Sequence, residues 1–322
     1  MKRTLILLVA VILFGALAWY ATAERTAAGR DYERAFAFPE TERIARIFIA
    51  DREGHRAELT RGGETGWQYN GQPANENVMK NLLQAIEHIE VQSLPTSKAV
   101  PNLVRNLAGG GILVQLFDAD GTKLRGYYIG GGANGELGTA AIMEESENPY
   151  IVHLPMWTGN LRHRFNLRDD EWRSKLLFNV DPARVEYLSI DYPKQRNKSF
   201  QLERTAAGGY RVTALYDSGT PELAVPAGVA EGVLSRYEKF YISRYENQDE
   251  PSIRAARAVL PFAIIRIKEA DRAEQVMKVY PRFVDPAGES LGAYTAFIND
   301  DRDWVLLAVE TTQPLLVSYD SF

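Results

Sequence analysis

The sequence predicts an α+β protein: two tandem copies of a mostly antiparallel sheet, each with one covering helix, after an N-terminal transmembrane helix. Three observations predict this arrangement. An apolar run stands near the N-terminus, short strand patterns follow in hairpins that do not alternate with helices, and the same succession of patterns recurs about 140 to 155 residues later. Strands that follow one another in hairpins favour an antiparallel α+β layer over a doubly wound sheet.

The apolar run covers residues 5–23 and carries no charge. A bilayer-spanning helix needs about 20 such residues. Lys2 and Arg3 precede the run and an acidic residue follows it, which predicts a cytoplasmic N-terminus and a body on the periplasmic or extracytoplasmic side. We therefore expect residues 1–23 to be a single-pass anchor in the inner membrane, or an uncleaved signal. Cleavage after Ala23, where an A-x-A pattern stands, is the open alternative.

The repeat begins with an alternating, β-branched stretch at residues 44–49 that recurs at residues 185–190. Apolar residues at helical spacing follow in both copies, at 78–89 and at 229–240. The pattern predicts one main helix per copy. From these correspondences we assign the stalk to residues 24–39, the first copy to 40–168, a linking helix to 169–180 and the second copy to 181–322.

The composition excludes several classes of function. The formal net charge is −5, and a mildly acidic chain does not offer the basic stripe that sequence-independent nucleic-acid binding requires. Cysteine is absent, so disulfides, thiolate metal sites, cysteine nucleophiles and the lipidated cysteine of a lipoprotein are all excluded.

A glycine-rich segment at residues 130–135 satisfies the G-x-G-x-x-G spacing of a dinucleotide-binding turn. That fingerprint requires a helix to begin there, so that the backbone amides at the helix N-terminus can bind the pyrophosphate. Residues 137–143 instead resemble another strand, and we interpret the glycines as a flexible hairpin loop. A loop that faces a ligand stays open as an alternative, and no cofactor is expected.

Two acidic segments, at residues 118–121 and 299–303, are typical of turns between strands. The first lacks the later ligands of a calcium loop, and the four histidines do not show the spacing of a zinc site. No serine stands in a known nucleophile motif. The sequence therefore nominates no catalytic and no metal-binding residue.

Aromatic residues, with two residues of the glycine-rich segment, provide the candidate ligand or partner surface. Aromatic side chains are enriched at interface hot spots, but packing in the core and sheets is the simpler explanation, and we prefer it. The candidate residues are Trp67, Tyr69, Gly131, Asn134, Trp157 and Trp172.

Four segments together resemble the bacterial domain-of-unknown-function 4340 family. They are residues 67–71 (WQYNG), the helix at 78–89, residues 137–139 (LGT) and residues 171–178 (EWRSKLLF). Glu171 replaces the Asp that is usual in the family. The resemblance implies an N-terminal membrane helix and brings no established activity. Some relatives stand beside ABC-type export or gliding-motility systems, which implies an accessory role in the envelope.

The sequence thus favours a membrane-anchored, envelope-exposed, non-enzymatic binding or scaffold module, accessory to a membrane transport or export complex. Two alternatives stay open: an exported hydrolase that acts on envelope polymers through dispersed carboxylates, and a small-solute sensor that uses the cleft between the copies.

Overall fold

The computed structural model describes residues 31–62, 66–133, 135–155, 157–166, 169–216, 222–285 and 287–322. The expected transmembrane anchor, residues 1–23, lies outside these ranges. Among the described residues, no helix has both the length and the apolar character needed to cross a bilayer.

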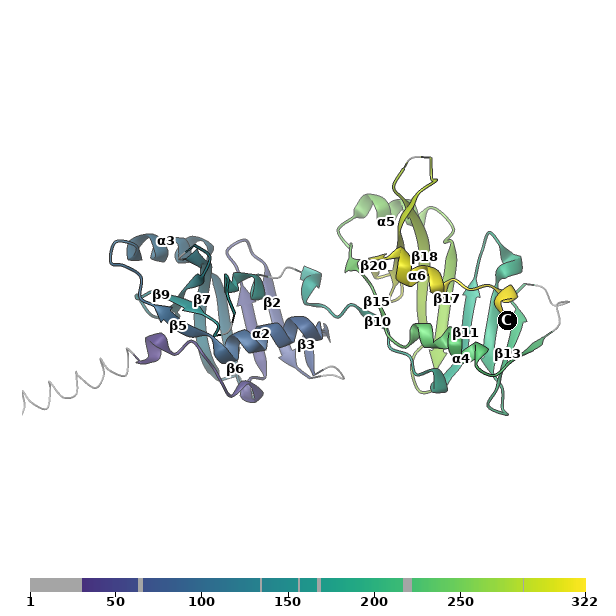
Figure 1. Ribbon diagram of the computed structural model, residues 1–322, viewed down its shortest axis with the longest axis horizontal. Helices are drawn as coiled ribbons and strands as arrows, with labels where there is room; N and C mark the ends of the chain where they lie inside the picture. Colours follow the sequence, from purple (N-terminus) through teal and green to yellow (C-terminus); the bar gives the residue numbers. More distant parts are fainter. Residues whose placement is uncertain are drawn as a thin grey trace, which may run out of the picture. The chain divides into compact units, whose positions relative to one another are not determined.

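The described chain forms two compact units, divided between Ser174 and Lys175. Each unit is built on a nine-stranded sheet whose neighbouring strands all pair antiparallel, with a few helices on its faces (Figure 1). The predicted α+β class is therefore confirmed.

The first unit contains helices α2 and α3 and strands β1 to β9. Its helices are Glu76–His88 (α2) and Val100–Gly110 (α3). Its strands are Arg46–Ala50 (β1), Arg56–Arg61 (β2), Trp67–Tyr69 (β3), Gln72–Pro73 (β4), Glu90–Ser93 (β5), Ile112–Phe117 (β6), Lys123–Ala133 (β7), Gly138–Met143 (β8) and Tyr150–His153 (β9).

The second unit contains helices α4 to α6 and strands β10 to β20. Its helices are Val229–Leu234 (α4), Glu250–Arg257 (α5) and Val309–Thr312 (α6). Its strands are Leu176–Phe178 (β10), Val185–Asp191 (β11), Phe200–Arg204 (β12), Tyr210–Ala214 (β13), Leu223–Val225 (β14), Phe240–Tyr241 (β15), Arg244–Tyr245 (β16), Ala263–Glu269 (β17), Gln275–Phe283 (β18), Leu291–Ile298 (β19) and Asp303–Leu307 (β20).

The two large sheets have the same strand order, β4-β3-β2-β1-β6-β7-β8-β9-β5 and β14-β13-β12-β11-β17-β18-β19-β20-β16. The buried positions also correspond: Ile47 and Ile49 of β1 are matched by Leu188 and Ile190 of β11, 141 positions later. This shared order supports the tandem repeat that the sequence predicts.

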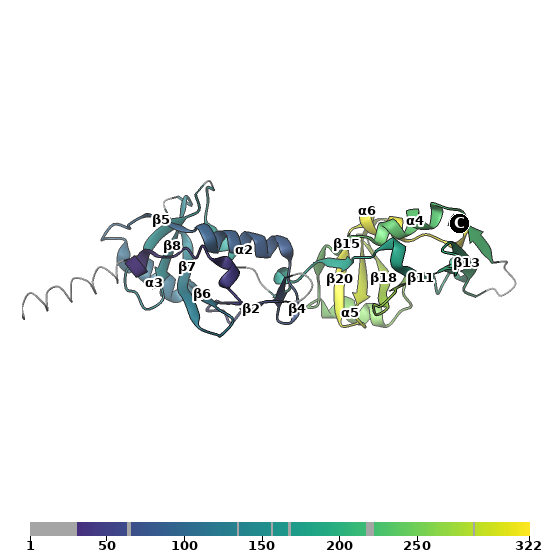
Figure 2. The ribbon, with the colours of Figure 1, turned by 90° about the horizontal axis from the view of Figure 1, so that it is seen from below.

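The expectation of a single covering helix in each unit is wrong. In the first unit α2 packs on the face that carries Ile129, whereas α3 packs against β7 and β8 on the opposite face, where Gly130 lies. In the second unit α4 and α6 lie on one face of the sheet and α5 lies on the other (Figure 2). The sequence did not reveal α3 because only Leu107 of that helix is buried.

One arginine in each unit ties the start of the central strand to the neighbouring hairpin. Arg61 donates from Nε to the carbonyl of Ile44 and from Nη2 to that of Thr41, both at 2.9 Å. Its guanidinium also lies 4.8 Å from the centre of the Trp67 ring. The second unit repeats these contacts with Arg204, Val185, Pro182 and Tyr210.

The expected stalk is partly wrong, because its C-terminal end belongs to the first unit. Phe36 and Phe38 are buried in the first core, and the Phe38 N–H donates to the carbonyl of Ile86 at 2.9 Å. Phe178 and Val180 are buried in the second core in the same way. Both units therefore begin with an apolar segment that crosses the end of the main helix, several residues before the first long strand.

The expected linking helix at residues 169–180 is also wrong. The chain forms a short 3₁₀ turn, Asp169–Trp172, and then the strand β10, which pairs with β15. The backbone groups hydrogen-bond to neighbouring segments: the Ser174 N–H donates to the Pro73 carbonyl, and the Lys175 carbonyl accepts from Ile242, both at 2.8 Å. Those contacts replace the i to i−4 bonds on which an α-helix depends.

Candidate functional site

A groove of about 460 Å³ lies on the face of the second sheet that α5 partly covers. Four elements form it: α5 and the loop after it provide one wall, and β18, β19 and β20 provide the floor. A turn between β11 and β12 adds the last side chain. The lining residues are Lys194, Ser252, Ala255, Ala256, Val259, Leu260, Phe262, Tyr280, Pro281, Arg282, Thr295 and Trp304.

The floor of the groove rests on an aromatic cluster that is separate from the main core. The ring centres of Phe297 and Trp304 are 4.6 Å apart, and those of Tyr280 and Trp304 are 5.7 Å apart. Trp304 is only 2% exposed, and its indole Nε1 finds no hydrogen-bond acceptor among the described residues. Burial, with a smaller effect from the Asp301 carboxylate, raises the pKa of Tyr280. The floor is therefore apolar and keeps its phenol protonated.

The wall beside α5 exposes apolar side chains to solvent. Val259 is 55% exposed and Leu260 is 59% exposed, although both are large and hydrophobic. Two further apolar residues follow the lining residue Arg282: Phe283, at the end of β18, and Val284, in the turn after it. They are 47% and 74% exposed. Adjacent exposed apolar residues of this kind are typical of a binding surface.

Cations provide the charged part of the lining. Lys194 is exposed and forms no ion pair with any residue that the structure describes. Arg282 lies 2.9 Å from Glu246, a carboxylate that Arg244 also contacts at 2.6 Å. The nearby Asp249 carboxylate caps α5, and hydrogen bonds from Ser252 lower its pKa. Within the described part of the lining, no side chain is acidic and none is histidine.

In the first unit a glycine stands at the position that corresponds to Tyr280. Ile129 pairs with Ile112 in the same way that Val279 pairs with Ala263, so Gly130 corresponds to Tyr280. A Cβ atom on Gly130 would lie 2.8 Å from Cδ2 of Leu107, the buried residue of α3. The helix therefore sits close to the sheet in the first unit, whereas aromatic side chains separate α5 from the sheet in the second.

A second groove, of about 480 Å³, runs along α2 in the first unit. Its lining mixes both signs of charge with apolar side chains: Trp67, Ala74, Glu76, Met79, Lys80, Leu83, Gln84 and Glu87. This groove includes one residue of the predicted surface.

The other residues of that predicted surface do not come together. Tyr69 and Trp172 are 8% and 1% exposed and belong to the first core. Trp157 is half-buried against His163, with ring centres 5.3 Å apart. Gly131 is exposed on β7, with three strands of the sheet between β7 and the strand of Tyr69. Asn134 lies outside the described residues. The structure therefore does not bring these residues together in one surface, and the buried Tyr69 and Trp172 serve packing.

The glycine-rich segment is only in part the hairpin loop that the sequence predicts: Gly135 lies in the turn between the paired strands β7 and β8, but the first residues of the segment do not. Strand β7 continues to Ala133, so Gly130 and Gly131 are strand residues. Glycine is useful at the first of these positions because α3 approaches the backbone closely there. The acidic segment at 118–121 and residues 299–302 of the second acidic segment are confirmed as turns between paired strands, β6 with β7 and β19 with β20, whereas Asp303 begins β20.

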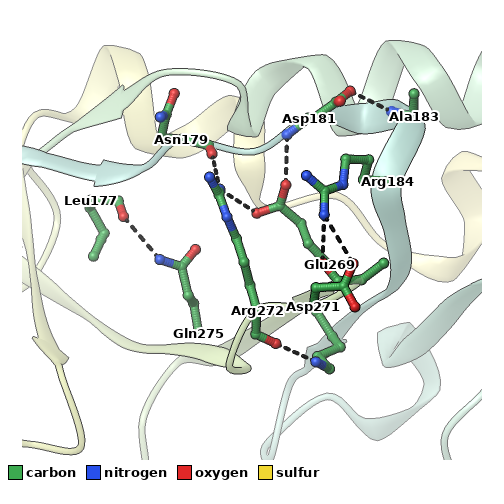
Figure 3. A network of polar contacts seen from close by, with 11 residues as sticks. Leu177, Asn179, Asp181, Ala183, Arg184, Glu269, Asp271, Arg272 and Gln275 are labelled. Carbon is green, nitrogen blue, oxygen red and sulfur yellow. Dashed lines mark hydrogen bonds and ion pairs between the residues drawn. The ribbon is translucent and has the colours of Figure 1, made fainter. Parts of the chain in front are cut away.

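A polar network fixes the segment at residues 177–181, which leads into the second unit (Figure 3). Glu269 is 5% exposed; its carboxylate accepts from the Asp181 N–H and from Arg272, both at 2.9 Å. Arg272 also donates to the Asn179 carbonyl at 2.8 Å. Arg184 extends the network to the carbonyl of Ala270 and the carboxylate of Asp271. The role of this network is structural, since each of these contacts joins two residues of the second unit.

Among the described residues, Asp51, Glu53 and His55 form a group of potential metal ligands, with ligand atoms within 4.8 Å of one another. The Asp51 carboxylate already accepts from the amides of Glu53 and His55, at 2.8 and 3.0 Å, and lies 2.8 Å from Nδ1 of His55. These contacts close the turn between β1 and β2, and a turn explains the arrangement without a metal ion.

The same contacts predict a pH dependence. Burial of Asp51 opposes ionisation, but the hydrogen bonds from the His55 side chain and from two amides outweigh it and lower the pKa below 3.8. A carboxyl with a lowered folded-state pKa stabilises the fold above its unfolded pKa, and this contribution is lost as the pH falls through the folded value. We expect Asp51→Asn to lower the melting temperature at neutral pH and the difference to shrink below about pH 4. A difference that stays constant in thermal melts from neutral to acid pH would contradict this role.

In the comparisons with known proteins, no protein-family model, no curated protein and no solved structure matches this chain.

Proposed function

We propose that this chain is a membrane-anchored, envelope-exposed, non-enzymatic binding module that holds an apolar ligand in the groove beside α5. The observation that carries the proposal is the groove itself, in which exposed Val259 and Leu260 face a floor formed by Tyr280 and Trp304. Small-molecule sites are mostly apolar concavities with a few polar groups, and their volumes run from about 300 to 1,000 Å³.

The composition of the groove supports binding over hydrolysis. A glycosidase needs two carboxylates on either side of the scissile bond, and other hydrolases need a base beside a nucleophile. The described lining residues offer the hydroxyls of Ser252, Tyr280 and Thr295 and the cations Lys194 and Arg282, but no carboxylate and no histidine, and the raised pKa of Tyr280 keeps that phenol protonated.

The remaining parts of the proposal rest on the sequence. The uncharged run at residues 5–23, after Lys2 and Arg3, supports a single-pass anchor with the body on the periplasmic or extracytoplasmic side. The resemblance to the domain-of-unknown-function 4340 family supports an accessory role beside a membrane transport or export complex. In this proposal the anchor keeps the binding module at the membrane surface, near such a complex.

Site-specific photocrosslinking in living cells tests the proposal on the full chain. Benzoylphenylalanine replaces Val259, which lines the groove, or Tyr241, which lies outside the lining; the two native side chains are 55% and 54% exposed. We expect an adduct of defined mass from position 259 and none from position 241.

A second substitution ties the adduct to the groove. Ala255→Phe places a large side chain in the lining and should remove the adduct, whereas Ala258→Phe, on an exposed residue outside the lining, should not. No adduct from position 259, or an adduct that survives Ala255→Phe, would overturn the proposed binding role of the groove.

A further inference from the structure

We propose that the ligand is a single-chain amphiphile: an unbranched alkyl chain in the groove with an anionic carboxylate head beside Lys194. The inference rests on the proposed function and specifies the ligand of the same site. Three features of the groove carry it: the apolar lining, the excess of positive charge and the position on the face of the sheet.

The lining suits a hydrocarbon chain because few of the lining side chains need a hydrogen-bond partner. Ala255, Val259, Leu260 and Phe262 offer only carbon atoms from their side chains. The Thr295 hydroxyl already donates to the Tyr280 carbonyl, at 3.4 Å. Burial of an alkyl chain against such a surface contributes about 0.8 kcal/mol per methylene group.

The charge around the groove favours an anion over a cation. Arg244 and Arg282 share the carboxylate of Glu246, which leaves that group with one positive charge in excess. Lys194 adds a cation without an ion-pair partner in the described chain. Two opposing carboxylates lie nearby: that of Asp249 is engaged at the N-terminus of α5, and that of Asp301 forms an ion pair with Lys278.

The position on the sheet argues against an extended peptide as the occupant. A peptide strand binds by adding hydrogen bonds to a free sheet edge. The strands below the groove, β18, β19 and β20, each pair with a neighbour on both sides along part of their length, and the groove lies on the face of the sheet. An alkyl chain needs no such bonds.

Calorimetric titration of the full chain in discs of zwitterionic lipid tests the inference, with empty discs to subtract partitioning. The probes are decanoate, decanol and decyltrimethylammonium, which share the chain and differ in the head. We expect decanoate to bind about fivefold more tightly than decanol, the range of an exposed ion pair, and the cation to bind most weakly. Lys194→Glu should weaken decanoate and leave decanol unchanged.

The groove variants separate this inference from the proposed function. Ala255→Phe should abolish binding of both decanoate and decanol, and Ala258→Phe should leave both intact. Equal affinity for decanoate and decanol, or no effect of Lys194→Glu, would overturn the anionic head. Failure of every probe, with a groove-dependent adduct in cells, would overturn the ligand class while the proposed function stands.

Discussion

Replacement of Glu269 by Ala should unfold the second unit at markedly lower denaturant concentration while the first unit is unaffected. Glu269 is 5% exposed and accepts from the Asp181 N–H and from Arg272 (Figure 3). Without the carboxylate, the amide of Asp181 loses its acceptor and Arg272 loses its ion-pair partner. Loss of one partner from a buried charged network costs about 3–5 kcal/mol; we expect about 2–4 kcal/mol, because Arg272 is partly exposed.

Hydrogen exchange measured by mass spectrometry localises this effect. Peptides from β17 and β18 should lose protection in the Glu269→Ala variant, and peptides from β6 and β7 in the same chain serve as the internal reference. Asp271→Asn is the matched control, because that carboxylate is 90% exposed, its ion pair with Arg184 lies at the surface, and asparagine tolerates the positive φ of this position. If the Asp271 and Glu269 variants lose protection equally, the buried carboxylate does not fix the leading segment.

The sequence alone was sufficient to predict the two sheet-rich units, because burial on one face imposes a pattern with a period of two. Ile47 and Ile49 of β1 and Leu188 and Ile190 of β11 follow that pattern in both copies. Helices α3 and α5 escaped prediction because they bury only one and two residues, too few for a helical period to stand out. Tertiary packing, more than local propensity, defines these helices.

The groove could not be predicted for a different reason. Its residues come from segments that are far apart in the chain: Lys194, Val259 and Trp304 meet only because β11, β17, β18, β19 and β20 assemble in that region of the sheet. The sequence pattern around an aromatic residue near a turn is the same whether its side chain faces the core or a groove. Trp172 and Trp304 are both almost fully buried, yet the first belongs to the main core and the second to the cluster below the groove.

Gly130→Ala should destabilise the first unit and loosen α3, although the change adds a single methyl group. The added Cβ would lie 2.8 Å from Cδ2 of Leu107 and 3.1 Å from the carbonyl oxygen of Ala140. The second contact is with backbone, so the strand cannot yield by a rotamer change alone. Overpacking of this kind costs about 1–3 kcal/mol, and amide exchange in α3 should rise more than exchange in α2.

Gly131→Ala is the matched control on the same strand, since a Cβ there meets nothing within 4 Å. It should be neutral or slightly stabilising, because alanine restricts the unfolded chain more than glycine does. Leu107→Ala tests the mechanism. If the added methyl group collides with Leu107, the double variant should lose less unfolding free energy than the sum of the losses in the two single variants. If the two losses of unfolding free energy are additive, the strain lies at Ala140 alone. A coupled result would mean that residue size on this face sets how closely the helix approaches the sheet. The large Tyr280 at the corresponding position would then explain the groove beside α5 in the second unit.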